Sequence, residues 1–193
     1  KRAACGVLMR PKERGRKVFH VIAWCVVLAL YLYADLFSRG KMFVVGLFLI
    51  FLILDMLRLY FHIQLPFLSL LRKEERKRFF TPTRTMLGLA IAVLLFEKPF
   101  VVAGFLMMIF GDFVAPLVGQ CGHRWIPWNK KKNFEGAGAE LVVDAVIGFL
   151  VFNSWSVALV MALTATLVET FNQHWDDNMM ITPVASLVGT LIS

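Results

Sequence analysis

Apolar runs of nearly membrane-spanning length follow one another along most of this chain. A helix rises 1.5 Å per residue, so about 20 residues carry it across a hydrocarbon layer ~30 Å thick. A mean hydropathy of +0.69, with charged residues at 18%, is too apolar for one soluble core. We therefore expect an all-α integral membrane protein in which residues 1–193 form a single transmembrane domain. The predicted spans are 18–37, 42–63, 84–97, 99–119, 136–152, 155–171 and 179–193.

One stretch between these runs is too charged to cross a bilayer. Residues 64–80 combine leucine and phenylalanine with a group of basic side chains between Arg72 and Arg78. Such a mixture is typical of an amphipathic helix that lies in the membrane interface, and we expect an interfacial segment there. Just before it, Asp55 and Arg58 stand three residues apart on a helix and are expected to pair.

The distribution of lysine and arginine predicts the orientation, because basic residues are retained on the cytoplasmic side of a membrane. Seven of them fall in the N-terminal tail, seven from Arg58 to Arg84, and four from Arg124 to Lys132. The opposite side receives three, namely Arg39, Lys41 and Lys98. We therefore expect a cytoplasmic N-terminus and a C-terminus on the other side. The net charge of +8 follows from this topology and needs no nucleic-acid partner.

Carboxylates within the apolar runs gather toward the same cytoplasmic face. Asp112 lies roughly 10 Å inside the fourth run at helical rise, and Glu140 and Asp144 stand one turn apart in the fifth. Ionisable groups are costly inside a membrane and are usually functional there. A small transporter with a cation or proton path is one interpretation, but it predicts polar groups throughout the membrane depth and an internal repeat. A non-catalytic scaffold would have little use for Asp112.

The segment from Gly111 to Gly136 is the first candidate site. Small residues at 111, 115 and 119 form a ridge that suits close helix packing, and a lysine run alone is typical of a cytoplasmic loop. Neither reading explains a carboxylate beside the ridge, or a basic loop, 119–135, that leads straight into another helix. Glycines admit a ligand to the backbone, and a helix start offers free N–H groups to an anion. We therefore predict a phosphate site that contains Gly111, Gly119, Gly122, Arg124, Lys130, Lys131, Lys132 and Gly136.

The second candidate is the acidic loop at 171–178. Glu169 precedes this loop and Asp177 lies within it, and the loop breaks the basic pattern of the other loops on its face. Oxygen ligands suit Mg²⁺, which usually bridges to nucleotide phosphates. The alternative is a solvated turn in which Asp177 or Asn178 caps the next helix. We favour a metal site whose ligands come from Asp112, Glu169 and Asp177.

Three weaker signals accompany these sites. Lys17 and His20 open the first helix, either as an interfacial anchor or as contacts to a phosphate or a lipid hydroxyl. Arg84 follows a good helix start at Thr81 and Pro82 and is expected to point inward. The three cysteines are far apart in the sequence, which indicates neither a disulfide framework nor a zinc site.

Taken in order, these motifs resemble those of the CTP-dependent lipid-alcohol kinases, the family of dolichol, polyprenol, phytol and yeast-type diacylglycerol kinases. The similarity runs across most of the chain. Its pieces are Arg16-Lys17-x-Phe19-His20, Gly111-Asp112-x-x-Ala115-x-x-x-Gly119-x-x-Gly122, Lys131-Lys132-Asn133-Phe134-Glu135-Gly136, and Glu169 with Asp177-Asn178 and Pro183. Asn133 departs from the family pattern, which has serine or threonine before the hydrophobic residue and Glu-Gly.

The resemblance implies an enzyme that uses CTP and Mg²⁺ to phosphorylate the hydroxyl of a membrane lipid alcohol. It implies catalytic roles for Asp112, Glu135 and Lys132, with Asp112 as general base or metal ligand, and a nucleotide contact for Asn178. Residues that would serve the lipid substrate or support the site are Lys17, His20, Arg84 and Glu140. Phosphatidate cytidylyltransferases share the aspartate-glycine helix and the lysine loop, and are the second interpretation because their C-terminal signature is absent. The identity of the alcohol and the oligomeric state, a dimer included, stay open.

Overall fold

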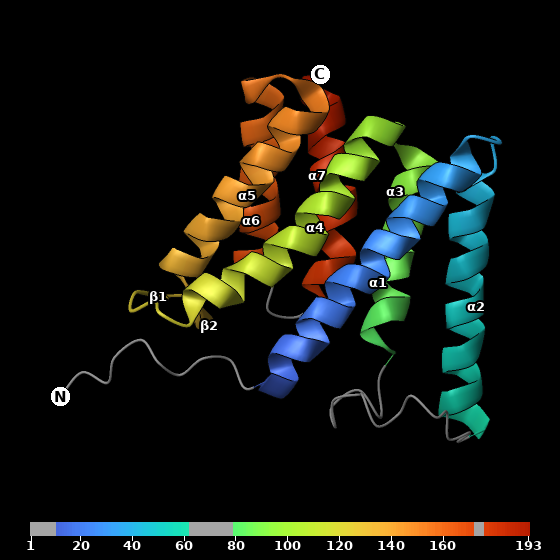
Figure 1. The fold of residues 1–193 in the computed structure, drawn as a ribbon, viewed down its shortest axis with the longest axis horizontal. Coiled ribbons are helices and arrows are strands. Elements are labelled where there is room, and N and C mark those ends of the chain that lie inside the picture. Colours follow the sequence, from blue (N-terminus) through green and yellow to red (C-terminus); the bar gives the residue numbers. More distant parts are fainter. Residues whose placement is uncertain (1–10, 62–78, 172–175) are drawn as a thin grey trace.

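The computed structural model describes residues 11–61, 79–171 and 176–193, and these form a bundle of helices that run back and forth between two ends (Figure 1). One end carries a small β-hairpin and is called the hairpin end here. The opposite end carries the C-terminus. The helices are α1 (Pro11–Asp35), α2 (Gly40–Phe61), α3 (Thr81–Leu95), α4 (Lys98–Gly119), α5 (Phe134–Phe152), α6 (Trp155–Phe171) and α7 (Asp177–Ile192).

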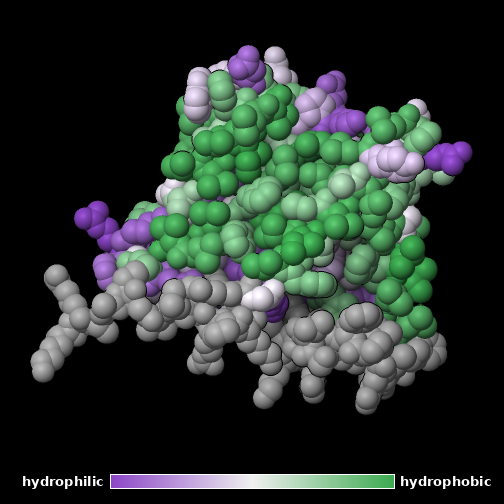
Figure 2. All heavy atoms as spheres, in the orientation of Figure 1, coloured by the Kyte–Doolittle hydropathy of each residue, from purple (hydrophilic) through white to green (hydrophobic). Residues whose placement is uncertain are grey.

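Each apolar run of the sequence coincides with one of these helices, and the ends agree within about three residues except at α1, which begins at Pro11, seven residues before the predicted span. Among the described residues, α1 from Gly15, α2 up to Tyr60 and the whole of α4 are long and apolar enough to cross a membrane. On the face shown in Figure 2, apolar residues cover most of the surface between the two ends, while polar ones gather toward the ends. Leu36 and Leu150, for example, are more than three-quarters exposed. Such a surface is stable in lipid and aggregates in water.

The core surrounds α4, which packs against α1, α5 and α7. Phe105, Met108 and Ile109 of α4 are fully buried. Small residues bring the backbones close together: a Cβ on Gly148 of α5 would lie 2.8 Å from the Cα of Ala158 on α6. Close backbone approach is the usual way that helices associate in membranes.

The segment between α4 and α5 is more ordered than the loop that we expected at 119–135. Strand β1 (Trp125–Ile126) pairs antiparallel with β2 (Asn129–Asn133), with Trp125 opposite Asn133 and a register irregularity between the two β1 residues. The basic loop that the sequence predicted between these helices therefore contains a short hairpin, which the sequence did not predict. Cys121, just before the hairpin, is disulfide-bonded, although the spacing of the cysteines indicated no disulfide.

A buried polar cluster fixes the start of α3 near the end of α2. Asp55 is fully buried and pairs with Arg58 at 2.9 Å, as the sequence predicted. Its other oxygen accepts hydrogen bonds from the Phe80 amide at 2.8 Å and the Thr83 hydroxyl at 2.6 Å. The expected interfacial helix at 64–80 lies almost entirely outside the described residues, and α3 begins only at Thr81.

Candidate active site

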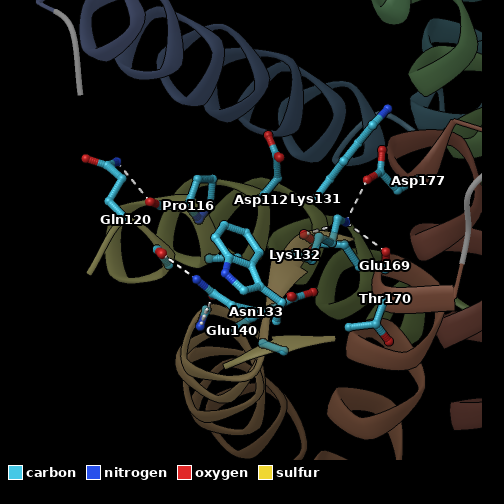
Figure 3. A pocket seen from close by; sticks show the side chains of 15 residues that line it. Asp112, Pro116, Gln120, Lys131, Lys132, Asn133, Glu140, Glu169, Thr170 and Asp177 are labelled. Carbon is cyan, nitrogen blue, oxygen red and sulfur yellow. Dashed lines mark hydrogen bonds and ion pairs between the residues drawn. The ribbon is translucent and has the colours of Figure 1, made fainter. Parts of the chain in front are cut away.

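A cavity of about 340 Å³ opens at the hairpin end, and five elements contribute to its walls (Figure 3). We call it the main cavity. The contributing elements are α4, the hairpin, α5, α6 and α7, and the lining residues run from position 112 to position 177, so the cavity depends on the tertiary fold. Its lining residues are Asp112, Ala115, Pro116, Gly119, Gln120, Trp125, Lys131, Lys132, Asn133, Gly136, Ala137, Glu140, Glu169, Thr170 and Asp177.

Lys132 connects the hairpin to two helices across the cavity. Its ammonium group lies 2.9 Å from Glu169 Oε1 and 3.0 Å from Asp177 Oδ2, and it also donates to the Glu169 carbonyl at 2.7 Å. Burial lowers the pKa of Lys132, but the two carboxylates outweigh burial and raise the pKa above its ordinary value. The lysine is therefore a fixed positive charge at this end of the bundle.

Lys131 has a different environment from its neighbour. Among the described residues it forms no ion pair, and its side chain is exposed at the cavity. An ammonium group without an ion pair can donate to an anion such as phosphate, whereas the charge of Lys132 is already matched by Glu169 and Asp177.

Asn133 joins the hairpin, α4 and α5 at one point. Its Oδ1 accepts a hydrogen bond from the Gly136 amide at 2.9 Å and so caps α5. Its amide group donates to the Gly119 carbonyl at the end of α4. The Gly136 N–H is thus already bonded within the protein, and the free helix start that we expected for phosphate is partly used by this cap.

The small-residue ridge of α4 packs closely against α5 and the hairpin. A Cβ on Gly136 would lie 2.6 Å from the Ala115 carbonyl, and one on Gly119 would lie 2.9 Å from Asn133 Oδ1. At Gly122, Asn133 and Glu135 occupy the space that a side chain would need. The glycines therefore admit neighbouring protein groups, and Gly122 does not line the cavity as a ligand contact would.

Glu135 points toward the loop that follows α4. Its Oε1 accepts backbone hydrogen bonds from His123 at 2.9 Å and Arg124 at 3.2 Å, and the Arg124 carbonyl accepts from the Phe134 amide. These backbone donors hold the pKa of Glu135 below its usual value, the His123 amide most of all. Neither Glu135 nor Arg124 lines the main cavity. The structure thus gives Glu135 a loop-fixing contact, and its expected catalytic role remains a prediction.

Asp112 stands at the mouth of the cavity beside α1. Lys17 donates to the Asp112 carbonyl at 2.6 Å and approaches its Oδ1 at 3.4 Å. The Asp112 side chain is 30% exposed, so this carboxylate is more accessible than its depth in the sequence suggested. His20, one turn further along α1, accepts a hydrogen bond from Trp24 Nε1 at 2.9 Å and does not line the cavity.

Three carboxyl groups lie deeper in the bundle. Glu140, Asp144 and Glu169 are almost completely buried, and Glu140 and Glu169 line the cavity. Gly111, predicted to contact the nucleotide, packs against Asp144: a Cβ there would lie 3.2 Å from its Oδ1. Both Asp144 carboxyl oxygens lack a hydrogen-bond partner among the described residues. The inner wall is therefore strongly polar in an otherwise apolar bundle.

The oxygen atoms of α6 and α7 suit part of a cation site. In the described part of the chain, no three carboxylate, histidine or cysteine side chains are arranged to hold a metal by themselves. Glu169 Oε2 is nevertheless buried without a hydrogen-bond partner among these residues, and Asp177 is close by through Lys132. Mg²⁺ typically takes one or two carboxylates and completes its shell with water and phosphate oxygens. Glu169 and Asp177 fit that pattern.

Two predicted residues of this end lie outside the cavity. Arg84 pairs with Asp176 at 3.0 Å and donates to the Phe79 carbonyl, which joins α3 to the start of α7. Burial raises the pKa of Asp176 to about 6, with a further contribution from Asp177 and an opposing one from Arg84. Asn178 is buried in the first turn of α7 and does not line the cavity.

A second hollow, of about 520 Å³, adjoins the hairpin turn. We call it the hairpin hollow. Its lining residues are Pro127, Trp128, Asn129, Lys130, Lys131, Lys132 and Asp177. The Trp128 ring lies parallel to that of Phe171 at the end of α6, with centroids 4.8 Å apart. Sequence reasoning did not find Trp125 or Trp128, and their one visible signal is a pair of tryptophans close to a lysine run.

Comparison with known proteins gives no relative. No family model, no curated protein and no solved structure matches this chain.

Proposed function

We propose that the protein is a membrane-embedded phosphotransferase that moves the terminal phosphoryl group of a nucleoside triphosphate to the hydroxyl of a lipid alcohol. One observation carries the proposal. Two lysines and the carboxylates of Asp112, Glu169 and Asp177 line a single cavity at one end of an apolar bundle. Phosphoryl transfer needs positioning and charge neutralisation more than covalent help, and those groups can provide both. CTP as the donor is taken from the family resemblance.

The orientation belongs to the same proposal. The hairpin end faces the cytoplasm, because the basic segments around Arg84 and Lys132 lie there, and all seven helices cross the membrane. α5 has 19 residues, about 28 Å at helical rise, which spans a hydrocarbon layer. Nucleotide then reaches the site from the cytoplasm, while the lipid arrives through the bilayer with its hydroxyl at the interface.

The residues divide the chemistry as follows. Lys131 binds the phosphate chain, because it has no competing ion pair among the described residues. Glu169 and Asp177 hold the ammonium group of Lys132 beside the proposed position of the phosphate chain. Glu169 and Asp177 would hold Mg²⁺, which when bound neutralises the developing charge on the phosphates. Asp112 accepts the proton of the attacking hydroxyl, since it lines the cavity and remains accessible.

The test is phosphoryl transfer by the purified protein in detergent micelles that contain phytol or diacylglycerol. CTP labelled at the γ phosphate should transfer its label to the extracted lipid, and α-labelled CTP should not. Transfer of the α label, assayed with phosphatidate, would instead indicate a cytidylyltransferase. If neither label reaches the lipid, the proposal is contradicted.

A matched pair of variants locates the chemistry. Asp112→Asn should lower the rate by about 10²–10⁴, the contribution of a positioned proton acceptor. Asp35→Asn removes a carboxylate of similar exposure at the opposite end, where it pairs with Lys98, and should keep the activity. Full activity of the Asp112 variant would exclude the proposed role of this residue.

A further inference from the structure

The main cavity and the hairpin hollow share three lining residues, Lys131, Lys132 and Asp177. The shared residues carry the charges that a phosphate chain and its cation would need. Each space has a tryptophan, Trp125 in the main cavity and Trp128 in the hairpin hollow, but Asp112 and the small apolar residues of α4 and α5 line the main cavity alone, and Lys130 lines the hairpin hollow alone. A transferase with two substrates needs such an arrangement, because the transferred group must contact both substrates at once.

The main cavity supplies what an acceptor alcohol requires. Of the two spaces, only the main cavity is lined by Asp112. Its lining also includes Ala115 and Pro116, one turn from Asp112 on α4, and Ala137 of α5, whose side chains are apolar. A hydroxyl beside the carboxylate, with a hydrocarbon chain along these apolar side chains, matches this surface.

The hairpin hollow supplies what a nucleoside requires. Trp128 lines it and is held parallel to Phe171, and Lys130 adds a further cation. Asn129 keeps the turn in place, because its amide group donates to the Thr170 carbonyl at 3.2 Å and its Oδ1 accepts from the Lys131 amide. Any nucleobase can stack on an aromatic side chain, and an aromatic side chain that is already held in place loses little conformational freedom when it binds one.

We infer that the hairpin hollow is the nucleoside subsite and that the main cavity is the acceptor subsite, with the transferred phosphate at the shared residues Lys131, Lys132 and Asp177. This assignment rests on the proposed phosphotransferase function. The hairpin then acts as the partition between the two substrates, and the nucleotide enters past Trp128 and Lys130.

The transfer step balances within this arrangement. The lipid hydroxyl oxygen in the main cavity forms a bond to the γ phosphorus, and the bond from that phosphorus to the β–γ bridging oxygen breaks. Asp112 takes the hydroxyl proton. The nucleoside diphosphate leaves with the bonding electrons through the hairpin hollow, and the phosphorylated lipid leaves through the main cavity.

The test is to substitute one residue in the lining of each space and to measure the KM for Mg·CTP and the KM for the lipid alcohol. Trp128→Ala should raise the KM for Mg·CTP about tenfold, the usual cost of losing one base–aromatic contact, and leave the KM for phytol within twofold. Ala137→Leu places a larger side chain in the lining of the main cavity and so reduces the space for the lipid, and leucine is well tolerated in a helix. This variant should raise the KM for phytol and leave that for Mg·CTP within twofold.

Lys130→Gln serves as a second variant of the hairpin hollow, because Trp128→Ala also removes the contact with Phe171. Lys130→Gln leaves the contact between Trp128 and Phe171 intact, and it should raise the KM for Mg·CTP but not the KM for phytol. Interchanged effects, or equal effects of every variant on both constants, would overturn the assignment of the subsites while leaving the phosphotransferase function intact. A wild-type protein that transfers no γ label refutes the proposed function itself, and the subsites with it.

Discussion

At the scale of single residues, the candidate site depends on charges that are fixed before any ligand arrives. Lys132 donates to two carboxylates and one carbonyl, whereas the adjacent Lys131 forms no ion pair in the described part of the chain. The two lysines therefore do different things despite their identical chemistry. Lys132 holds α6 and α7 in position, and Lys131 is available to an anion.

Replacement of Lys132 tests this division. Lys132→Met should leave Glu169 and Asp177 without their cation and destabilise the protein by about 1–3 kcal/mol, less than for a completely buried pair. Phosphoryl transfer should fall by about 10²–10³, as when a preorganised electrostatic contact is lost. Thermal unfolding in detergent and the γ-label assay measure the two effects. Lys98→Met removes an ion pair at the opposite end and is the control; equal losses in both variants would argue against a special role for Lys132.

Glu135 gives a prediction about pH. Its pKa is lower in the folded protein than its ordinary value, because backbone N–H groups bind the carboxylate. The stability from this group is therefore present above the ordinary pKa of 4.5 and is lost as the pH falls through the lower folded-state value. Wild type should exceed Glu135→Gln in melting temperature at pH 7, and the difference should shrink toward pH 4. A difference that is independent of pH would contradict this reading.

At the scale of elements, the helices could be predicted and the hairpin could not. Apolar length alone located all seven helices, because a continuous apolar run in this chain has no other stable form in lipid. Strand β1 has only two residues, and β2 reads Asn-Lys-Lys-Lys-Asn without apolar alternation. The hairpin is held by hydrogen bonds from Asn129 to the Thr170 carbonyl and from Asn133 to the Gly119 carbonyl. These partners are distant in the sequence, so no local pattern reveals them.

The candidate site shows the same limit. The sequence identified the charged members of the main cavity, Asp112, Lys131, Lys132, Glu169 and Asp177, because charges are conspicuous in an apolar chain. It assigned Gly122 to a ligand, although Asn133 and Glu135 occupy that space. Whether a glycine serves a ligand or a neighbouring side chain depends on the tertiary fold.

A pair of glycine variants tests how the hairpin is attached. Gly122→Ala places a methyl group against Asn133 and Glu135, 2.7 Å from Glu135 Oε2, and should destabilise the protein by about 1–3 kcal/mol through this overpacking. Gly138→Ala meets nothing within 4 Å on the first turns of α5 and should be neutral or stabilising by up to about 1 kcal/mol. Thermal unfolding measures both. If the two variants lower the melting temperature equally, the close packing at Gly122 is unimportant.

At the scale of the whole molecule, polar chemistry is concentrated at one end. The main cavity, the hairpin and the Arg84–Asp176 pair all lie at the hairpin end, while the opposite end offers the exposed Lys98–Asp35 pair. We propose that this molecule presents its site to one side of a membrane only. In the proposed orientation the basic residues set that side, since moving the hairpin end across the bilayer would carry most of the positive charge with it.

Labelling of single introduced cysteines from one side of the membrane tests this orientation. Ser156→Cys lies exposed at the start of α6, at the opposite end, and Lys130→Cys lies exposed on the hairpin. In sealed, right-side-out vesicles, an impermeant maleimide should label Ser156→Cys at once. It should label Lys130→Cys only after detergent is added, because the proposed orientation places the hairpin in the interior. The unsubstituted protein measures the background from the native cysteines. Labelling of the hairpin before detergent would place the nucleotide site outside the cell, where no nucleotide pool could supply the proposed reaction.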